Sequence, residues 1–85
     1  MIRADILDTA KQCICTDRED EYGTPQENLG RIAALWSGYA AHDFTAHDVA
    51  VMMALVKVGR IASGKVKQDT YVDMAGYAAL AGELA

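Results

Sequence analysis

Carboxylate and cationic side chains recur at helical spacing in the last third of the sequence. Asp69 and Asp73 are four residues apart and Tyr77 follows four residues later, so one face of a helix would carry two carboxylates and a phenol. The segment before them carries Lys57 and Arg60. If the two segments form antiparallel helices joined by a turn near residue 65, Lys57 lies opposite Asp73 and Arg60 lies opposite Asp69.

This set of residues has two interpretations. Carboxylate oxygens suit Mg²⁺, so Asp69 and Asp73 could hold the metal. Lys57 and Arg60 would then bind the phosphates of a nucleotide, with Tyr77 continuing the same binding face. The alternative is a group of ordinary ion pairs between two helices, together with an N-cap at Asp69.

A second charged stretch precedes Gly23. Five of the six residues from Asp17 to Tyr22 are charged. If Glu19 or Asp20 turned toward the carboxylates of the last helix, the acidic residues would form one metal site. Glu19 or Asp20 would then be the candidate base that activates water. A solvated helix end explains the same residues equally well.

Other catalytic chemistries find little support in the sequence. It has no G-x-S-x-G motif and no phosphate-cradling glycine loop, and neither histidine has a paired Ser or Cys. Cys13 and Cys15 would point about 200° apart on a helix, so we expect free thiols. Trp36 and Tyr39 could stack on a base, but aromatic residues at helical spacing also fit a core.

The charge balance limits the class of partner. The formal net charge is -4, and Lys and Arg form no contiguous run, which disfavours a protein that coats nucleic acid. A small anionic ligand remains compatible, because two or three convergent basic groups can hold a phosphate. Charges interrupt the N-terminus, and no apolar run could cross a bilayer. We therefore expect a cytoplasmic protein without membrane contact.

Apolar periodicity predicts an all-α protein. We expect one domain over residues 1–85, formed by about four antiparallel helices at approximately 2–18, 25–41, 46–62 and 69–83. The start of the second helix is marked by Thr24 as N-cap, Pro25 at the first helical position and Glu27 closing a capping box. Residues 45–48 repeat the capping-box pattern, and Asp69 can cap the last helix.

The core of so short a chain should be thin. Alanine supplies much of the apolar content, and the larger core candidates are few: Ile32, Trp36, Met52 and Leu80. Gly76 and Gly82 within the last helix each cost about 1 kcal/mol relative to alanine, so a close helix crossing or ligand approach would explain them. We expect a homo-oligomer that completes the core.

Four runs of residues together resemble a known family. The runs are Arg18-x-x-x-Tyr22-Gly23-x-x-x-x-Asn28, Ile32-Ala33-x-Leu35-Trp36, Asp48-Val49-Ala50-x-Met52-Met53-x-Leu55-x-Lys57-x-x-Arg60-Ile61 and Lys67-x-Asp69-x-Tyr71-x-Asp73-x-Ala75-Gly76-Tyr77. The combined pattern covers about residues 15 to 82. It resembles DUF6378-like proteins, a family of small phage and prophage proteins of uncharacterised function.

That family is in turn loosely similar to the all-α nucleotide pyrophosphohydrolases of the MazG type. The resemblance implies a MazG-like fold and Mg²⁺-dependent cleavage of nucleoside triphosphates to monophosphate and pyrophosphate. It carries over Asp69 and Asp73 as metal ligands, and Lys57 and Arg60 as phosphate binders. The sequence departs from the MazG pattern because it has no E-x-x-E motif.

Three functions follow as hypotheses from different classes. The first is a nucleotide pyrophosphohydrolase that uses Mg²⁺. The second is a non-catalytic module that sequesters a nucleotide, which the missing E-x-x-E motif favours. The third is an interaction protein that only assembles with itself or with another chain.

Overall fold

The computed structural model describes residues 1–85 and contains helices and no strand. A π-helical turn, η1, joins the first two α-helices without a break. The elements are α1 (Arg3–Gln12), η1 (Cys13–Asp17), α2 (Arg18–Tyr22), α3 (Pro25–Ala40), α4 (Ala46–Ala62) and α5 (Gln68–Leu84). The all-α prediction is confirmed. No helix is both long and apolar enough to traverse a lipid bilayer.

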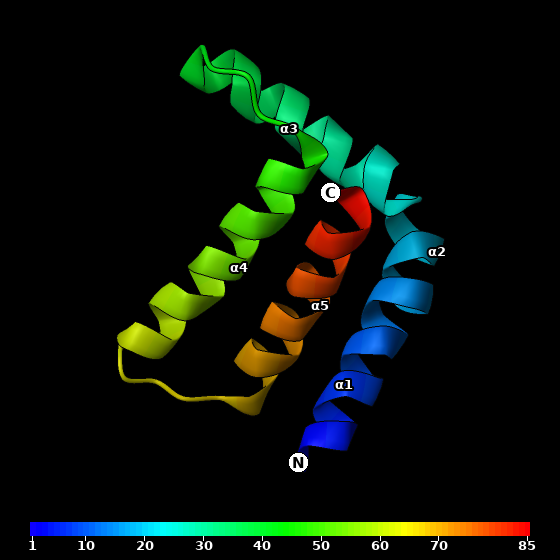
Figure 1. Ribbon diagram of the computed structural model, residues 1–85, viewed down its shortest axis with the longest axis vertical. Coiled ribbons are helices and arrows are strands. Elements are labelled where there is room, and N and C mark those ends of the chain that lie inside the picture. Colours follow the sequence, from blue (N-terminus) through cyan, green and yellow to red (C-terminus); the bar gives the residue numbers. More distant parts are fainter.

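Three helical rods lie side by side and α3 crosses one end of them (Figure 1). The rods are α4, α5 and the continuous segment α1–η1–α2. α4 and α5 are antiparallel, as predicted, but α1 and α5 point in the same direction. The expected bundle of four antiparallel helices is therefore correct only for the α4–α5 hairpin. The chain turns sharply at Gly23, whose φ of +89° lies in the region that favours glycine, and α3 then runs across the other helices.

The starts of α3 and α4 are capped as the sequence predicts. The Thr24 hydroxyl accepts a hydrogen bond from the Glu27 amide at 3.2 Å, and the Glu27 carboxylate accepts from the Thr24 amide at 3.4 Å. Thr45 and Asp48 form the same reciprocal pair at 3.1 and 2.9 Å. These bonds satisfy amides that a helix start otherwise leaves unpaired.

The predicted cap of the last helix is wrong. α5 begins at Gln68 with Lys67 at the N-cap position, and no side chain caps it. Asp69 is instead the second residue of the helix, where its carboxylate still suits the helix dipole.

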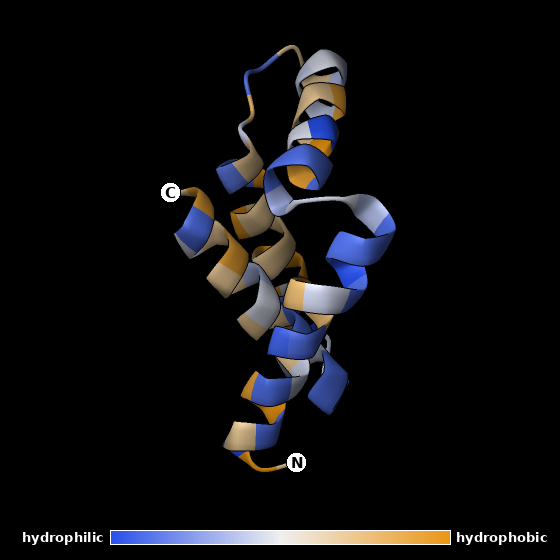
Figure 2. Cartoon of the chain, turned by 90° about the vertical axis from the view of Figure 1, so that its right-hand side faces the viewer, coloured by the Kyte–Doolittle hydropathy of each residue, from blue (hydrophilic) through white to orange (hydrophobic).

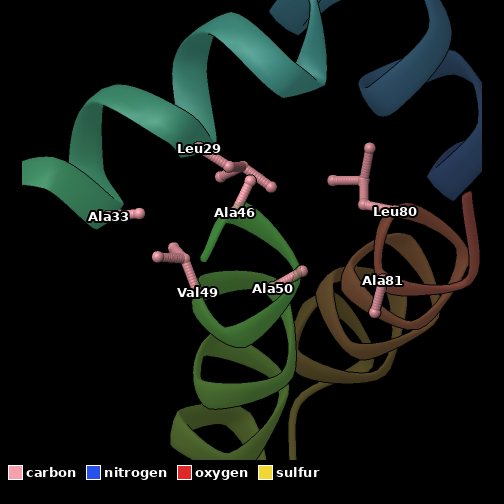
Figure 3. Packing of buried hydrophobic residues seen from close by; sticks show 7 residues of the cluster. All are labelled: Leu29, Ala33, Ala46, Val49, Ala50, Leu80 and Ala81. Carbon is pink, nitrogen blue, oxygen red and sulfur yellow. The ribbon is translucent and has the colours of Figure 1, made fainter. Parts of the chain in front are cut away.

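The core lies where α3, α4 and α5 meet. Its seven buried residues are Leu29, Ala33, Ala46, Val49, Ala50, Leu80 and Ala81 (Figure 3). Four of the seven are alanines, so the helices approach closely but bury little volume. Trp36 is only partly buried against this cluster, and Tyr39 is 96% exposed. The thin core that composition predicts is confirmed.

A close helix crossing accounts for one of the two helical glycines singled out in the sequence. A Cβ built on Gly76 would lie 3.0 Å from Ile14 Cγ2, so α5 and η1 are in contact at this point. Nothing lies within 4 Å of a Cβ built on Gly82. Gly76 therefore sets the distance between the first rod and α5, and a groove lies beside this crossing.

Candidate functional site

Two adjoining cavities lie between the η1–α2 segment and α5. Ile14, Arg18, Tyr77 and Leu80 line both of them. The first cavity, of about 60 Å³, is completed by Ala10, Cys13, Val72, Asp73 and Gly76. The second, of about 20 Å³, is completed by Glu19, Gly23, Pro25, Asn28 and Leu29. We refer to the two cavities together as the α2–α5 groove.

The π turn determines which charge faces this groove. The Arg18 amide bonds to the Cys13 carbonyl, five residues back, so η1 contains one residue more per turn than an α-helix. One extra residue rotates everything that follows by about 100°. On an unbroken α-helix, Asp17 would follow Ala10 and Ile14 onto the inward face. The π turn places Arg18 beside the groove, where it lines both cavities with a side chain that stays exposed to solvent, whereas Asp17 lines no cavity.

Hydrophilic residues dominate the outer surface of the same rod. Figure 2 faces the α1–α2 side of the molecule and shows the stretch that leads to the α2–α3 connection as mainly hydrophilic. Asp17, Asp20 and Glu21 are exposed there. The solvated helix end proposed from the sequence describes most of this acidic stretch, and Arg18 is its single cation.

One ion pair is present in the chain, between Lys57 Nζ and Asp73 Oδ2 at 3.1 Å. The predicted apposition of Lys57 and Asp73 across the α4–α5 hairpin is thus confirmed. The Lys57 side chain is 12% exposed and that of Asp73 40%, so the pair lies at the edge of the first cavity. Lys57 neutralises Asp73 in the first cavity, and Glu19 lines only the second, so Arg18 is the one charged residue that lines both cavities.

The structure divides the predicted site residues into two groups. Tyr77 and Asp73 line the groove, and Glu19 lines its second cavity. Lys57 is partly buried beside Asp73 and lines no cavity, and the last three candidates are exposed and line none: Asp20, Arg60 and Asp69. Arg60 and Asp69 form no ion pair with each other.

The carboxylates do not gather into one donor set. No group of three or more His, Cys, Asp or Glu side chains lies close enough to hold a metal ion. Asp73 is already paired with Lys57, and Asp69 lies one turn away on the exposed start of α5. The residues of one chain therefore do not fit the Mg²⁺ site that the MazG resemblance implies, since such a site requires several converging oxygen ligands.

One groove residue, Arg18, was not predicted as a binding residue. Arg18 stands within an acidic run, and its position beside the groove depends on the π turn. The sequence left Asn28, beside the α3 cap, as either a donor to a ligand or a residue facing water; it is partly buried and lines the second cavity. The available signal was that Arg18 is the one cation among the charged residues that precede Gly23.

Residues 5–85 match the domain of unknown function DUF6378. The chain belongs to the DUF6378 family. It is similar to the Gene 55 protein of Mycobacterium phage L5, with 49% identity over 74 residues, and to the Gene 55 protein of Mycobacterium phage D29, with 41% identity over 73 residues.

Both alignments cover 86% of this chain but only 47% and 48% of the phage proteins. The chain thus spans about half the length of the curated relatives that it matches. No solved structure matches it. The predicted resemblance to a family of phage proteins is confirmed, and the α2–α5 groove is a feature of a DUF6378 domain.

Proposed function

We propose that this DUF6378 protein binds a nucleotide in the α2–α5 groove, with Arg18 as the phosphate-binding residue. The observation that carries the proposal is an unpaired guanidinium on the wall shared by two cavities, in a protein whose net charge is -4. A cation facing a cavity of an acidic protein favours a small anionic ligand over a nucleic acid.

The other wall residues suit the remainder of such a ligand. A guanidinium can bind a phosphate with two parallel hydrogen bonds. Tyr77 and Asn28 add a phenol and an amide, and Ile14, Leu29 and Leu80 add apolar surface. The two cavities are smaller than the roughly 300–1,000 Å³ of pockets that enclose a whole ligand. The phosphate therefore enters the cavity beside Arg18, and the base and sugar lie along the open part of the groove.

Hydrolysis is the second candidate. Glu19 lines the second cavity next to Arg18, which favours Glu19 over Asp20 as a base near a bound phosphate. The MazG resemblance would add Mg²⁺ held by Asp69 and Asp73, but the carboxylates of one chain do not form that donor set. Binding without turnover is the better-supported activity, because it requires only the groove.

The test is incubation of the purified protein with a panel of ribo-, deoxyribo- and cyclic nucleotides and Mg²⁺ or Mn²⁺. Chromatography then measures free ligand and products. We expect depletion of one nucleotide class with the ligand recovered unchanged. Monophosphate released with pyrophosphate would replace binding with hydrolysis as the function. No depletion of any nucleotide would contradict both candidates.

Substitution of Arg18 locates the site. A hydrogen bond to a charged group contributes about 1.5–3 kcal/mol, so Arg18→Gln should weaken nucleotide affinity by about 10- to 100-fold in calorimetric titration. Arg31→Gln is the matched control, because Arg31 is an exposed and unpaired cation on α3 that lines no cavity. Equal nucleotide affinities of the Arg18→Gln and Arg31→Gln variants would show that the nucleotide binds outside the groove.

A further inference from the structure

α4 is apolar on the face that points away from the core as well as on the face that forms it. Ala46, Val49 and Ala50 face the core. On the opposite side, residues recur at intervals of three and four: Asp48, Val51, Leu55, Val58 and Ala62. We call these five residues the α4 seam. A helix that is apolar on all sides is normally buried on all sides.

The four apolar residues of the seam are exposed in the single chain, and Asp48 is partly buried. The exposed fractions of Val51, Leu55 and Val58 are 39%, 61% and 45%, and Val56 beside them is 46% exposed. Intervals of three and four residues are those at which one helix packs along another with side chains interlocked. The seam therefore has the pattern of a helix–helix contact that the chain itself does not complete.

The accessible surface area and the radius of gyration are both larger than expected for a compact monomer of this length. A compact monomer of 9.2 kDa should expose about 4,900 Å², whereas the chain exposes 5724 Å². The excess is close to the roughly 800 Å² that each partner buries in a standard protein–protein interface. The radius of gyration, 13.3 Å, also exceeds the value of about 12 Å expected for 85 residues.

A hollow continues the seam toward α3. It has a volume of about 300 Å³ and is lined only by apolar residues: Trp36, Tyr39, Ala40, Phe44 and Met52. Met52 follows Val51 on α4 and joins the hollow to the seam. Tyr39, at 96% exposure, marks its rim. Together the hollow and the seam form one extended apolar surface.

We propose that the α4 seam is the contact between two copies of this chain, packed antiparallel about a two-fold axis near Leu55. The seam is nearly symmetric about that residue, because Asp48 and Ala62 are each seven residues from it and Val51 and Val58 are four and three residues away. Val51 of one copy then lies near Val58 of the other, and Asp48 lies beside Ala62. A two-fold contact must be complementary to itself, and this spacing meets that condition.

Charge favours the antiparallel arrangement. Asp43 and Asp48 lie at the start of α4, whereas Arg60, Lys65 and Lys67 lie at and beyond its end. Reversing the second copy places the acidic end of each α4 beside the basic end of the other, and it also opposes the helix dipoles. A parallel pair would bring like charges together. A second copy therefore fits this surface in both shape and charge.

The interface is independent of the α2–α5 groove. The seam faces away from α5, and α5 separates α4 from the α1–α2 rod in Figure 1. Two copies joined through α4 leave both grooves open. Failure of nucleotide binding would not affect this proposal, and a monomeric protein would not affect the proposed function.

The test is molar mass by light scattering coupled to size exclusion. We expect the wild-type protein to have about twice the chain mass of 9.2 kDa, and Leu55→Lys to have the chain mass itself. Leu7→Lys is the matched control, because Leu7 is also a leucine on a helix with 61% exposure, and it should remain dimeric. Circular dichroism checks that all three proteins are folded.

A second measurement covers the case in which Leu55→Lys does not fold. In a chain carrying Cys13→Ser and Cys15→Ser, a short bismaleimide should crosslink Leu55→Cys into a dimer and leave Leu7→Cys as a monomer. A monomeric wild-type protein, a Leu55→Lys variant that stays dimeric, or crosslinking through Leu7→Cys instead of Leu55→Cys would each overturn the proposal.

Discussion

Arg18 and Asp73 line the same cavity but offer a ligand different charges. Asp73 is paired with Lys57 at 3.1 Å, so its carboxylate is already neutralised within the fold. Arg18 has no such partner. At the scale of single residues, the chemistry of the groove thus depends on which charges are already paired, and this favours an anion as the ligand.

Asp48 is the residue whose titration the structure predicts to change. The Thr45 backbone amide donates a hydrogen bond to its carboxylate at 2.9 Å, and this bond lowers the pKa of Asp48 from its ordinary value of 3.8. Desolvation opposes this bond with the second-largest effect, and the Thr45 hydroxyl and two nearby histidines lower the pKa further by smaller amounts. The charged carboxylate is therefore favoured in the folded state.

The sign of the pH dependence follows from this direction. A carboxyl whose pKa is lower in the folded state stabilises the fold above its unfolded pKa of 3.8, and that contribution is lost as the pH falls through the folded value. Asp48→Asn should lower the melting temperature at about pH 7, and the difference from wild type should narrow below about pH 4. Asp43→Asn, at an exposed carboxylate without a hydrogen bond, should show no such pattern. A difference that stays constant to about pH 2 would contradict the prediction.

At the scale of elements, the π turn and the η1–α5 crossing together form the groove. η1 places Arg18 beside the groove, and Gly76 allows Ile14 to approach α5 closely enough for Arg18 and Tyr77 to share a wall. Irregular turns of this kind are frequent at functional sites. The groove therefore depends on two local features, a widened turn and a residue without a side chain.

Gly76→Ala tests the crossing. Alanine favours a helix by about 1 kcal/mol over glycine, but a Cβ at 3.0 Å from the branched Ile14 side chain crowds the contact at a cost of about 1–3 kcal/mol. We expect a net loss of about 1 kcal/mol in the free energy of unfolding, measured with urea. In an Ile14→Ala background the same substitution should become neutral or stabilising, because the clashing methyl group is gone.

Gly82→Ala is the control on the same helix. Nothing lies within 4 Å of its Cβ, so only the helix preference acts, and the protein should gain up to about 1 kcal/mol. If both glycine substitutions stabilised the protein, α5 and η1 would not be in close contact at Gly76, which would contradict the 3.0 Å distance between a Cβ at Gly76 and Ile14 Cγ2.

At the scale of the whole molecule, the balance between core and surface is unusual. Eleven of 85 residues are buried, and the core is rich in alanine, while leucine and valine side chains are exposed along α4. A second copy packed on α4 would bury the apolar side chains that the single chain leaves exposed. Dimerisation would then contribute directly to folding stability.

This linkage predicts a melting temperature that depends on protein concentration. Because association stabilises the folded state by mass action, a tenfold increase in concentration should raise the wild-type melting temperature by a few degrees. Leu55→Lys should melt lower and at a temperature independent of concentration. Scanning calorimetry at several concentrations measures both. Concentration-independent melting of the wild type would indicate that the single chain is stable without a partner.

The sequence by itself predicted the local features of this protein. The helical segments, the Thr24 and Thr45 caps and the Lys57–Asp73 pair depend on residues a few positions apart or on a short turn that forces two helices to be antiparallel. Two residues of the groove, Asp73 and Tyr77, could also be predicted from the sequence, because their spacing places them on one face of a single helix. Local hydrogen bonding and helical spacing are sufficient for all of these.

The tertiary structure alone decided how the segments meet. It brought Arg18 instead of Asp17 to the groove, gathered no three acidic side chains into a metal site, and laid α3 across the other helices. These outcomes depend on a widened turn in η1 and on the contact of Ile14 with Gly76, which are 62 positions apart in the chain. Contacts at such separation depend on how whole helix faces pack, and no local pattern in the sequence specifies that packing.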